Sequence, residues 1–222
     1  LYLMLGRADL PGQPLAGRDA ELAAAADASN AQTAERQVNL DEARSAAAAS
    51  PEDVGAWLRL AMAAAAAGET NTELAALEQA EQLTKGDSAI RAMRAEAMSR
   101  AADGQVTIPA RELIARILAE DPSEPRALFL SGLAAYQDEN FGAAVEIWLR
   151  LQSLSAPDAP WMALIADNIA DAAQAGGIDL DAVTAARGPD AKTMAAAAEM
   201  SDEDRAAMIE GMVEGLAARL AE

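Results

Sequence analysis

The residues best suited to acid–base chemistry or metal binding are three consecutive acids, Asp202, Glu203 and Asp204. Clustered carboxylates can hold a hard cation, or exchange a proton when the pKa of one of them is raised. These acids directly follow Ser201, and a serine followed by acidic residues is a strong signal for the first turn of a helix. We therefore interpret them as helix-capping charges and expect no catalytic and no metal-binding residues.

Two residue types that often carry catalysis are missing from the sequence. Its 222 residues include no His and no Cys, which excludes imidazole bases, thiol nucleophiles and soft metal ligands. No phosphate-binding loop, nucleophile elbow or zinc-type spacing is present. The nine Met residues sit at ordinary apolar positions, which argues against haem ligation. We expect a protein that is not an enzyme and binds no cofactor.

The charge of the chain limits its partners. With 36 acidic and 17 basic residues, the net charge is -19. Nucleic acid is not expected as a partner, because too few cations are available to neutralise phosphates. Two interpretations of the acidity stay open: it attracts a basic polypeptide, or it keeps an Ala-rich protein soluble.

Residues 127–161 predict two packed helices and the start of a third. A polar break at residues 138–140 separates the two helices of the pair. Small residues at Gly132 and Ala144 let the helices approach closely, and the large side chain of Trp148 fills the space beside them. This exchange of small and large residues, in units of about 34 residues, is typical of helical-hairpin repeats. Such repeats stack into a solenoid that holds another polypeptide.

The rest of the chain predicts further helices of the same kind. They are expected at about residues 33–49, 53–67, 71–83, 88–102, 107–120 and 160–174. The predicted fold class is therefore all-α, a tetratricopeptide-like solenoid of helical hairpins over residues 33–175, closed by a capping helix.

Three flanking segments complete the predicted organisation. Residues 1–32 are expected to form an extended N-terminal segment or linker, in which residues 19–32 are either a weak helix or part of the linker. Residues 176–200 are expected to form a linker, and residues 201–222 the first helix of a truncated C-terminal helical module. We expect the natural protein to continue beyond both ends. No stretch is long and apolar enough to span a bilayer.

The repeat geometry also predicts a partner-binding groove, because the first helix of each hairpin lines the concave face of such a solenoid. The predicted groove residues are Leu58, Met62, Ala65, Arg91, Ala95, Ser99, Arg126, Phe129, Leu133 and Tyr136. Small, Met and aromatic side chains suit the apolar stripe of an amphipathic helix. For Met62 and Phe129, core packing is the alternative. Trp57 and Trp148 are predicted to be core residues, and Trp161 to pack the capping helix.

Several stretches resemble the CcmI/CycH family of cytochrome c maturation proteins. Three of them resemble its tetratricopeptide region: SPEDVGAWLRLAMAAAAAGE (50–69), GQVTIPARELIARILAEDPSEPRALFLSGLAAYQDENFGAAVEIWLRL (104–151) and SAPDAPW (155–161). LYLMLGRADLPGQPLAGR (1–18) resembles the segment that follows the family's membrane anchor. GPDAKTMAAAAEMSDEDRAAMIEGMVEGLAARL (188–220) resembles the linker and opening helix of a C-terminal module in α-proteobacterial members. The resemblance covers nearly the whole chain.

Two residues depart from the family's repeat pattern. Glu73 stands where a small residue is usual, and Lys85 stands where Pro is frequent. The first hairpin is therefore expected to pack loosely or in a shifted register.

The resemblance implies a function without catalysis. It implies a periplasmic protein, tethered to the bacterial inner membrane by an anchor that this sequence does not contain. Such a protein would bind the C-terminal helix of apocytochromes c and deliver it to the haem-ligation complex, whose other subunits would be further partners. The alternative hypothesis is a scaffold that joins subunits of an envelope assembly and leaves the groove empty.

Overall fold

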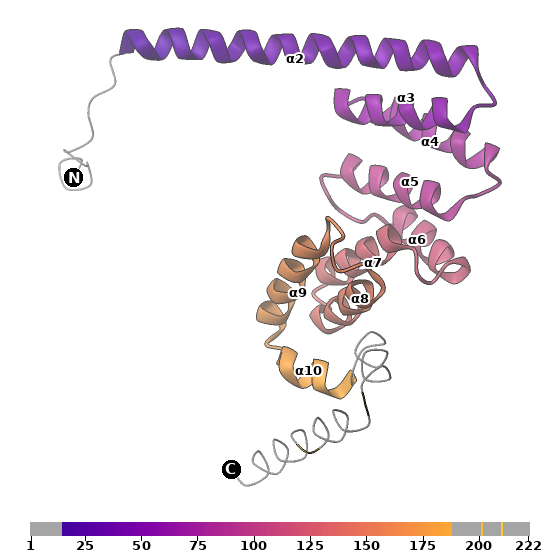
Figure 1. The fold of residues 1–222 in the computed structure, drawn as a ribbon, viewed down its shortest axis with the longest axis vertical. Helices are drawn as coiled ribbons and strands as arrows, with labels where there is room; N and C mark the ends of the chain where they lie inside the picture. Colours follow the sequence, from indigo (N-terminus) through magenta and orange to yellow (C-terminus); the bar gives the residue numbers. More distant parts are fainter. Residues whose placement is uncertain (1–14, 188–200, 202–209, 211–222) are drawn as a thin grey trace. The chain divides into compact units, whose positions relative to one another are not determined.

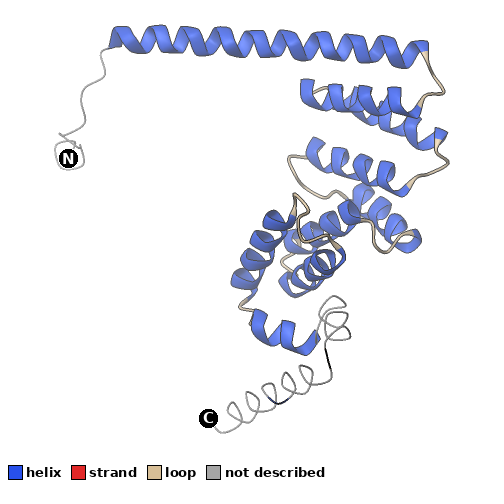
Figure 2. Cartoon of the chain, in the orientation of Figure 1, coloured by secondary structure: helices blue, strands red, loops and turns tan. Residues whose placement is uncertain are grey.

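The computed structural model describes residues 15–187, together with Ser201 and Glu210. Every regular element in this part of the chain is an α-helix (Figure 2), so the predicted all-α class is confirmed. The chain divides into two compact units, Leu1–Asp103 and Gly104–Glu222, and each is described by itself. The segment before residue 15 and most of the helix predicted from residue 201 lie outside the described residues.

The described residues of the first unit form α2 (Leu15–Ala49), α3 (Val54–Ala67), α4 (Thr70–Leu83) and α5 (Ser88–Ala101). The α3–α4 pair is the predicted first hairpin. Asp53 caps α3 by accepting a hydrogen bond of 2.8 Å from the backbone N–H of Gly55. Gly68 ends α3 with a left-handed backbone (φ 75°), so that α4 can return along α3.

The core of the first unit consists largely of Ala side chains. Ala56, Ala61, Ala64, Ala76 and Ala80 are all buried between the helices. Leu40, Leu60, Leu77 and Ile90 fill the remaining space, and full burial of each such side chain stabilises the fold by about 1.5–3 kcal/mol. The small Ala side chains thus allow the helices to pack closely, as the Ala-rich sequence predicts.

Helix α2 is longer than the sequence predicts. It begins at Leu15, whereas the sequence predicts an extended or weakly helical segment up to residue 32. Ala-rich sequence with no Pro or Gly after Gly17 favours a continuous helix, about 50 Å long at 1.5 Å per residue. Figure 1 shows α2 continuing beyond the end of α3. Leu40 and Ala47 near its end are buried, whereas Leu22 is 62% exposed.

Both departures from the repeat pattern have a structural reason. Glu73 is buried, and its two carboxylate oxygens accept hydrogen bonds of 3.0 and 2.8 Å from the Arg100 guanidinium. An ion pair between α4 and α5 therefore replaces the usual small residue. Lys85 has a positive φ of 57°, which the proline ring cannot adopt. The hairpin is well packed, so the expected loose packing is not seen.

The second unit contains α6 (Ile108–Glu120), α7 (Pro125–Gln137), α8 (Phe141–Leu154), α9 (Met162–Gly176) and α10 (Leu180–Arg187). The α7–α8 pair is the predicted third hairpin. Gly132 on α7 faces the indole of Trp148 on α8, which is 1% exposed. The Trp148 Nε1–H donates to the backbone oxygen of Phe129 at 3.1 Å. Trp148 is therefore the core residue that the sequence predicts.

Helix α9 covers the end of this hairpin. Ile165 and Ile169 are buried in one cluster with Val145, Trp148 and Leu151 of α8, which agrees with the predicted capping helix. Gly177 ends α9 with a φ of 61°. The linker expected from residue 176 instead includes the short helix α10, in which Asp179 caps the first turn.

Candidate functional site

Helix α7 carries four of the ten predicted groove residues on one face. Arg126, Phe129, Leu133 and Tyr136 follow one another at spacings of three, four and three residues, which places them along one side of the helix. All four are half-buried. We call them the α7 stripe.

The aromatic members of the α7 stripe pack against other rings and remain partly exposed. The ring of Tyr136 meets Phe141 edge-on at a centroid distance of 5.4 Å and lies 6.1 Å from the ring of Trp148. Phe129 lies 6.4 Å from the same indole. Core packing and partner binding are therefore compatible for these residues, since both rings pack against the core and are only half-buried.

Polar contacts fix α7 at both ends. At the C-terminal end of α7, Asp138 accepts hydrogen bonds from the Arg111 guanidinium of α6, one of them 3.0 Å long. This contact lowers the pKa of Asp138. Gln137 donates to the Gly104 oxygen and accepts from the Val106 N–H, at 2.8 and 2.9 Å. These contacts hold α7 against the segment that leads into α6.

At the start of α7, the carboxylate of Glu124 accepts a hydrogen bond from the N–H of Ala127. Glu124 is buried, and burial raises the pKa of its carboxyl above the ordinary value, although the Ala127 hydrogen bond and the charge of Arg126 act in the opposite direction. The helix therefore begins with a buried carboxylate that holds its first turn.

In the first unit, α3 presents the other accessible part of the predicted site. Met62 is 65% exposed, so the core alternative is wrong for this residue. Leu58 and Ala65 are half-buried on the same face, and Leu58 packs against the core. Trp57, predicted to be core, is only partly buried and donates from Nε1 to the Pro51 oxygen at 2.8 Å.

Helix α5 does not present the accessible groove surface that the repeat geometry predicts. Ala95 is 0% exposed and Ser99 is 3% exposed, and the Ser99 hydroxyl donates to the Ala95 oxygen at 3.0 Å. Both positions are therefore packing residues that a partner cannot touch. The prediction that Ala95 and Ser99 line the groove is wrong because small residues on a helix permit close packing as readily as they line a surface. Arg91 is half-buried.

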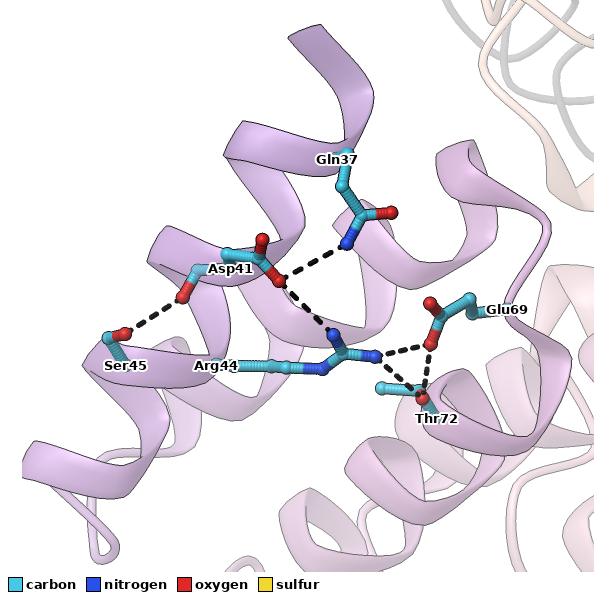
Figure 3. Close-up of polar contacts among 6 residues, drawn as sticks. All are labelled: Gln37, Asp41, Arg44, Ser45, Glu69 and Thr72. Atoms are coloured by element: carbon cyan, nitrogen blue, oxygen red, sulfur yellow. Dashed lines mark hydrogen bonds and ion pairs between the residues drawn. The ribbon is translucent and has the colours of Figure 1, made fainter. Parts of the chain in front are cut away.

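A polar cluster joins α2 to the start of α4, as Figure 3 shows. The Arg44 guanidinium contacts Glu69 and donates to Asp41 at 3.2 Å, and the Thr72 hydroxyl donates to Glu69 at 2.9 Å. All charges in the cluster are paired, so we assign it to helix packing. Within the described residues, no group of three or more carboxylates is arranged to hold a metal ion, and no helix could span a membrane.

Sequence reasoning missed one surface. Trp161 is 41% exposed, so the prediction that it packs the capping helix is wrong. Its indole N–H donates to the Ser155 hydroxyl in the turn before α9, at 3.0 Å. The preceding Pro157 and Pro160 could have suggested this, because prolines mark a turn in which a side chain is often exposed.

Comparisons with known proteins agree with this architecture. A family model described as "Cytochrome c-type biogenesis protein H TPR domain" matches residues 22–162, which confirms the predicted repeat type. The cytochrome c-type biogenesis protein CycH of Rhizobium meliloti (strain 1021) is 35% identical over 230 residues, covering 100% of this chain and 55% of the relative. CycH of Bradyrhizobium diazoefficiens is 35% identical over 156 residues, covering 63% of this chain and 40% of the relative.

The chain thus spans about half the length of the curated relatives that it matches. The family model covers most of the described helices, from within α2 to the start of α9. The resemblance found in the sequence is confirmed by these matches. The chain belongs to the CcmI/CycH family of cytochrome c-type biogenesis proteins, and residues 22–162 match its tetratricopeptide-repeat domain.

Proposed function

We propose that this chain is a non-catalytic, chaperone-like module that binds the C-terminal helix of apocytochrome c and delivers it to the haem-ligation complex. The family gives the role in cytochrome c-type biogenesis. The bound helix, the periplasmic location and the attachment to the inner membrane belong to the proposal.

The α7 stripe carries this proposal. It offers Phe129, Leu133 and Tyr136 in a row about two helical turns long, and all three are half-buried and packed against the core. An amphipathic helix recognises such a row through side chains spaced three and four residues apart. Because contacts at both ends hold α7 in place, little conformational entropy is lost when a partner binds.

Charge supports the same kind of partner. The net charge of -19 attracts basic polypeptides at long range and raises their association rate. A Lys-rich amphipathic helix would combine this attraction with burial of its apolar side. The electrostatic part of the affinity should fall as the Debye length shortens with added salt.

The test is a fluorescence-anisotropy titration of a labelled apocytochrome C-terminal peptide with the wild-type chain and with three variants. Phe129→Ala and Tyr136→Ala should each weaken binding by about tenfold, equal to about 1.4 kcal/mol. Met62→Ser tests the α3 face at a site where substitution costs little packing, since Met62 is 65% exposed.

A matched control is Ile108→Ser, which removes an apolar side chain that is 73% exposed and belongs to neither face. Circular dichroism must show unchanged helicity for each variant. Unchanged peptide affinity in Phe129→Ala and Tyr136→Ala, with helicity intact, would refute the assignment of the α7 stripe as the binding site.

The scaffold remains the second candidate function, and one observation favours it. Leu154, Trp161 and Leu164 are exposed near the start of α9, where another protein could dock without using the α7 stripe. Loss of co-purifying assembly subunits in Leu154→Ser combined with Leu164→Ser, with peptide affinity unchanged, would support the scaffold.

A further inference from the structure

The turn between α8 and α9 gathers large exposed apolar side chains. Leu154 is 53% exposed, Trp161 41% and Leu164 52%. Isolated exposed apolar residues are ordinary in proteins, but a group of them is a feature of interaction sites. We call Leu154, Trp161 and Leu164, with the intervening turn, the α8–α9 corner.

The indole at this corner is held in place before any partner arrives. The Trp161 Nε1–H donates to the Ser155 hydroxyl at 3.0 Å, and that hydroxyl donates in turn to the backbone oxygen of Leu151 at 2.8 Å. Leu154 precedes Ser155 in the chain, and Leu164 follows Trp161 by three residues, which places the two on one side of α9. An exposed Trp with a fixed ring is the side chain most enriched among binding hot spots.

The sequence that forms and follows the corner carries charge of a single sign. No Lys or Arg occurs between residues 151 and 186, whereas five Asp do. All five are exposed, namely Asp158, Asp167, Asp171, Asp179 and Asp181. The preceding cation, Arg150, directs its guanidinium to the Pro122 oxygen at 2.8 Å. The apolar corner is therefore accompanied in sequence by exposed carboxylates and by no cation between residues 151 and 186.

We propose that the α8–α9 corner is a docking surface for a basic segment of another protein, one that carries apolar side chains among lysines or arginines. The apolar side chains cover Trp161 and its leucine neighbours, and the cations pair with the carboxylates of Asp158 and Asp167. This surface uses none of the α7 stripe and does not rest on the proposed apocytochrome binding. An acidic partner would be repelled by the carboxylates of this surface, and a neutral apolar partner would leave them unpaired. Neither is therefore the expected partner.

The absence of Cys from the sequence allows a local probe. Ala163→Cys places a single thiol on an exposed position between Trp161 and Leu164, where an environment-sensitive dye can be attached. Ala115→Cys on α6, also exposed, is the labelling control. The probe ligand is a synthetic helical peptide of Leu and Lys, compared with a Leu and Glu peptide of the same pattern.

We expect a saturable blue shift of the dye at position 163 with the Leu and Lys peptide, and no comparable shift at position 115. In the full chain, Leu154→Ser combined with Leu164→Ser should weaken this response by about tenfold or more, whereas Ile108→Ser and Phe129→Ala should leave it unchanged. Added salt should weaken it as well.

Three results would overturn the proposal. They are an equal response to the Leu and Glu peptide, a response unchanged by the Leu154 and Leu164 substitutions, or a response lost in Phe129→Ala alone. The last result would mean that the peptide sits on the α7 stripe. If the apocytochrome peptide does not bind but the dye at position 163 still responds to the Leu and Lys peptide, the proposed function is refuted. The proposal for the α8–α9 corner would then still stand.

Discussion

Gly132→Ala tests the packing that positions the α7 stripe. A Cβ at this position would lie 2.3 Å from Nε1 of Trp148 and 2.6 Å from both Cδ1 and Cε2 of the same ring. Ordinary van der Waals contact begins near 3.4 Å, so the indole would have to move by about 1 Å in a core that packs as tightly as a crystal. Trp148 is 1% exposed and has no solvent side to move into.

The expected cost has three parts. Overpacking of a core costs about 1–3 kcal/mol. A displaced indole would lose its hydrogen bond to the Phe129 oxygen, and a buried donor without a partner costs about 1–3 kcal/mol more. Alanine regains about 1 kcal/mol of helix propensity over glycine. The net loss is about 1–5 kcal/mol of unfolding free energy, or roughly 2–20 °C in Tm for a chain of this size.

Urea and thermal unfolding, followed by circular dichroism and Trp fluorescence, measure this loss. Gly142→Ala is the matched control: it changes the same residue type on α8 at an exposed position, where an added Cβ meets nothing within 4 Å. That variant should be stabilised by about 0.4–1 kcal/mol. The double variant Gly132→Ala with Trp148→Leu should lose clearly less unfolding free energy than the sum of the losses of the two single variants.

If Gly132→Ala unfolds at or above the wild-type temperature, as Gly142→Ala should, the reasoning is refuted. The α7 and α8 helices would then not approach through Gly132, and the contact between Gly132 and Trp148 would not be what positions the α7 stripe.

Four further predictions follow from individual contacts. Arg100→Ala leaves the buried Glu73 carboxylate unpaired and should cost about 1.5–3 kcal/mol in urea unfolding; adding Glu73→Ala, which restores the small residue, should recover most of this, and an additive result would contradict the pairing. Glu124→Gln tests the raised pKa: the contribution of Glu124 to stability is fully present below its unfolded pKa, near 4.5, and is lost as the pH rises through the folded value. The Tm difference, variant minus wild type, should therefore increase from about pH 4 to about pH 7.5, and a constant difference would count against burial as the cause. In hydrogen exchange, amides in the first half of α2 should exchange much faster than those near Leu40, because an isolated helix without packing is marginal; uniform protection would show that this half is covered. Apocytochrome should bind more tightly than the haem-loaded form, whose folding buries the apolar stripe of its helix, and equal affinities would argue against recognition of that stripe.

The repeat elements can be predicted because their signals are local. Asp53 and Gly68 mark the ends of α3 by capping and by a left-handed backbone, both of which depend on the residue type itself. The pairing of Gly132 with Trp148 is also readable from the sequence, since a small residue on one helix leaves room for a large side chain on the helix that packs against it.

Exposure cannot be predicted in the same way. Helical phase assigns Ala95 and Met62 to the same surface, yet Ala95 is 0% exposed and Met62 is 65% exposed. Phase gives the direction of a side chain, whereas burial depends on what the rest of the chain brings against it. Trp161 shows the converse error, because its size suggests core packing, yet it is 41% exposed and its indole N–H donates to the Ser155 hydroxyl.

The first half of α2, up to residue 32, escapes prediction for a different reason. It has no apolar periodicity to recognise, and its main signal is the Ala-rich composition between residues 20 and 34. Intrinsic propensity alone is a weak basis for predicting a helix, because a helix that buries no face is usually unstable in water.

Titration of this chain with a labelled C-terminal helix peptide from a c-type apocytochrome, at low and at high salt, tests the proposed binding function most directly. We expect saturable binding that weakens as salt is added, since an acidic chain with an apolar stripe would be holding a basic amphipathic helix. No binding at either salt concentration, by a chain with full helicity, would contradict the proposed function.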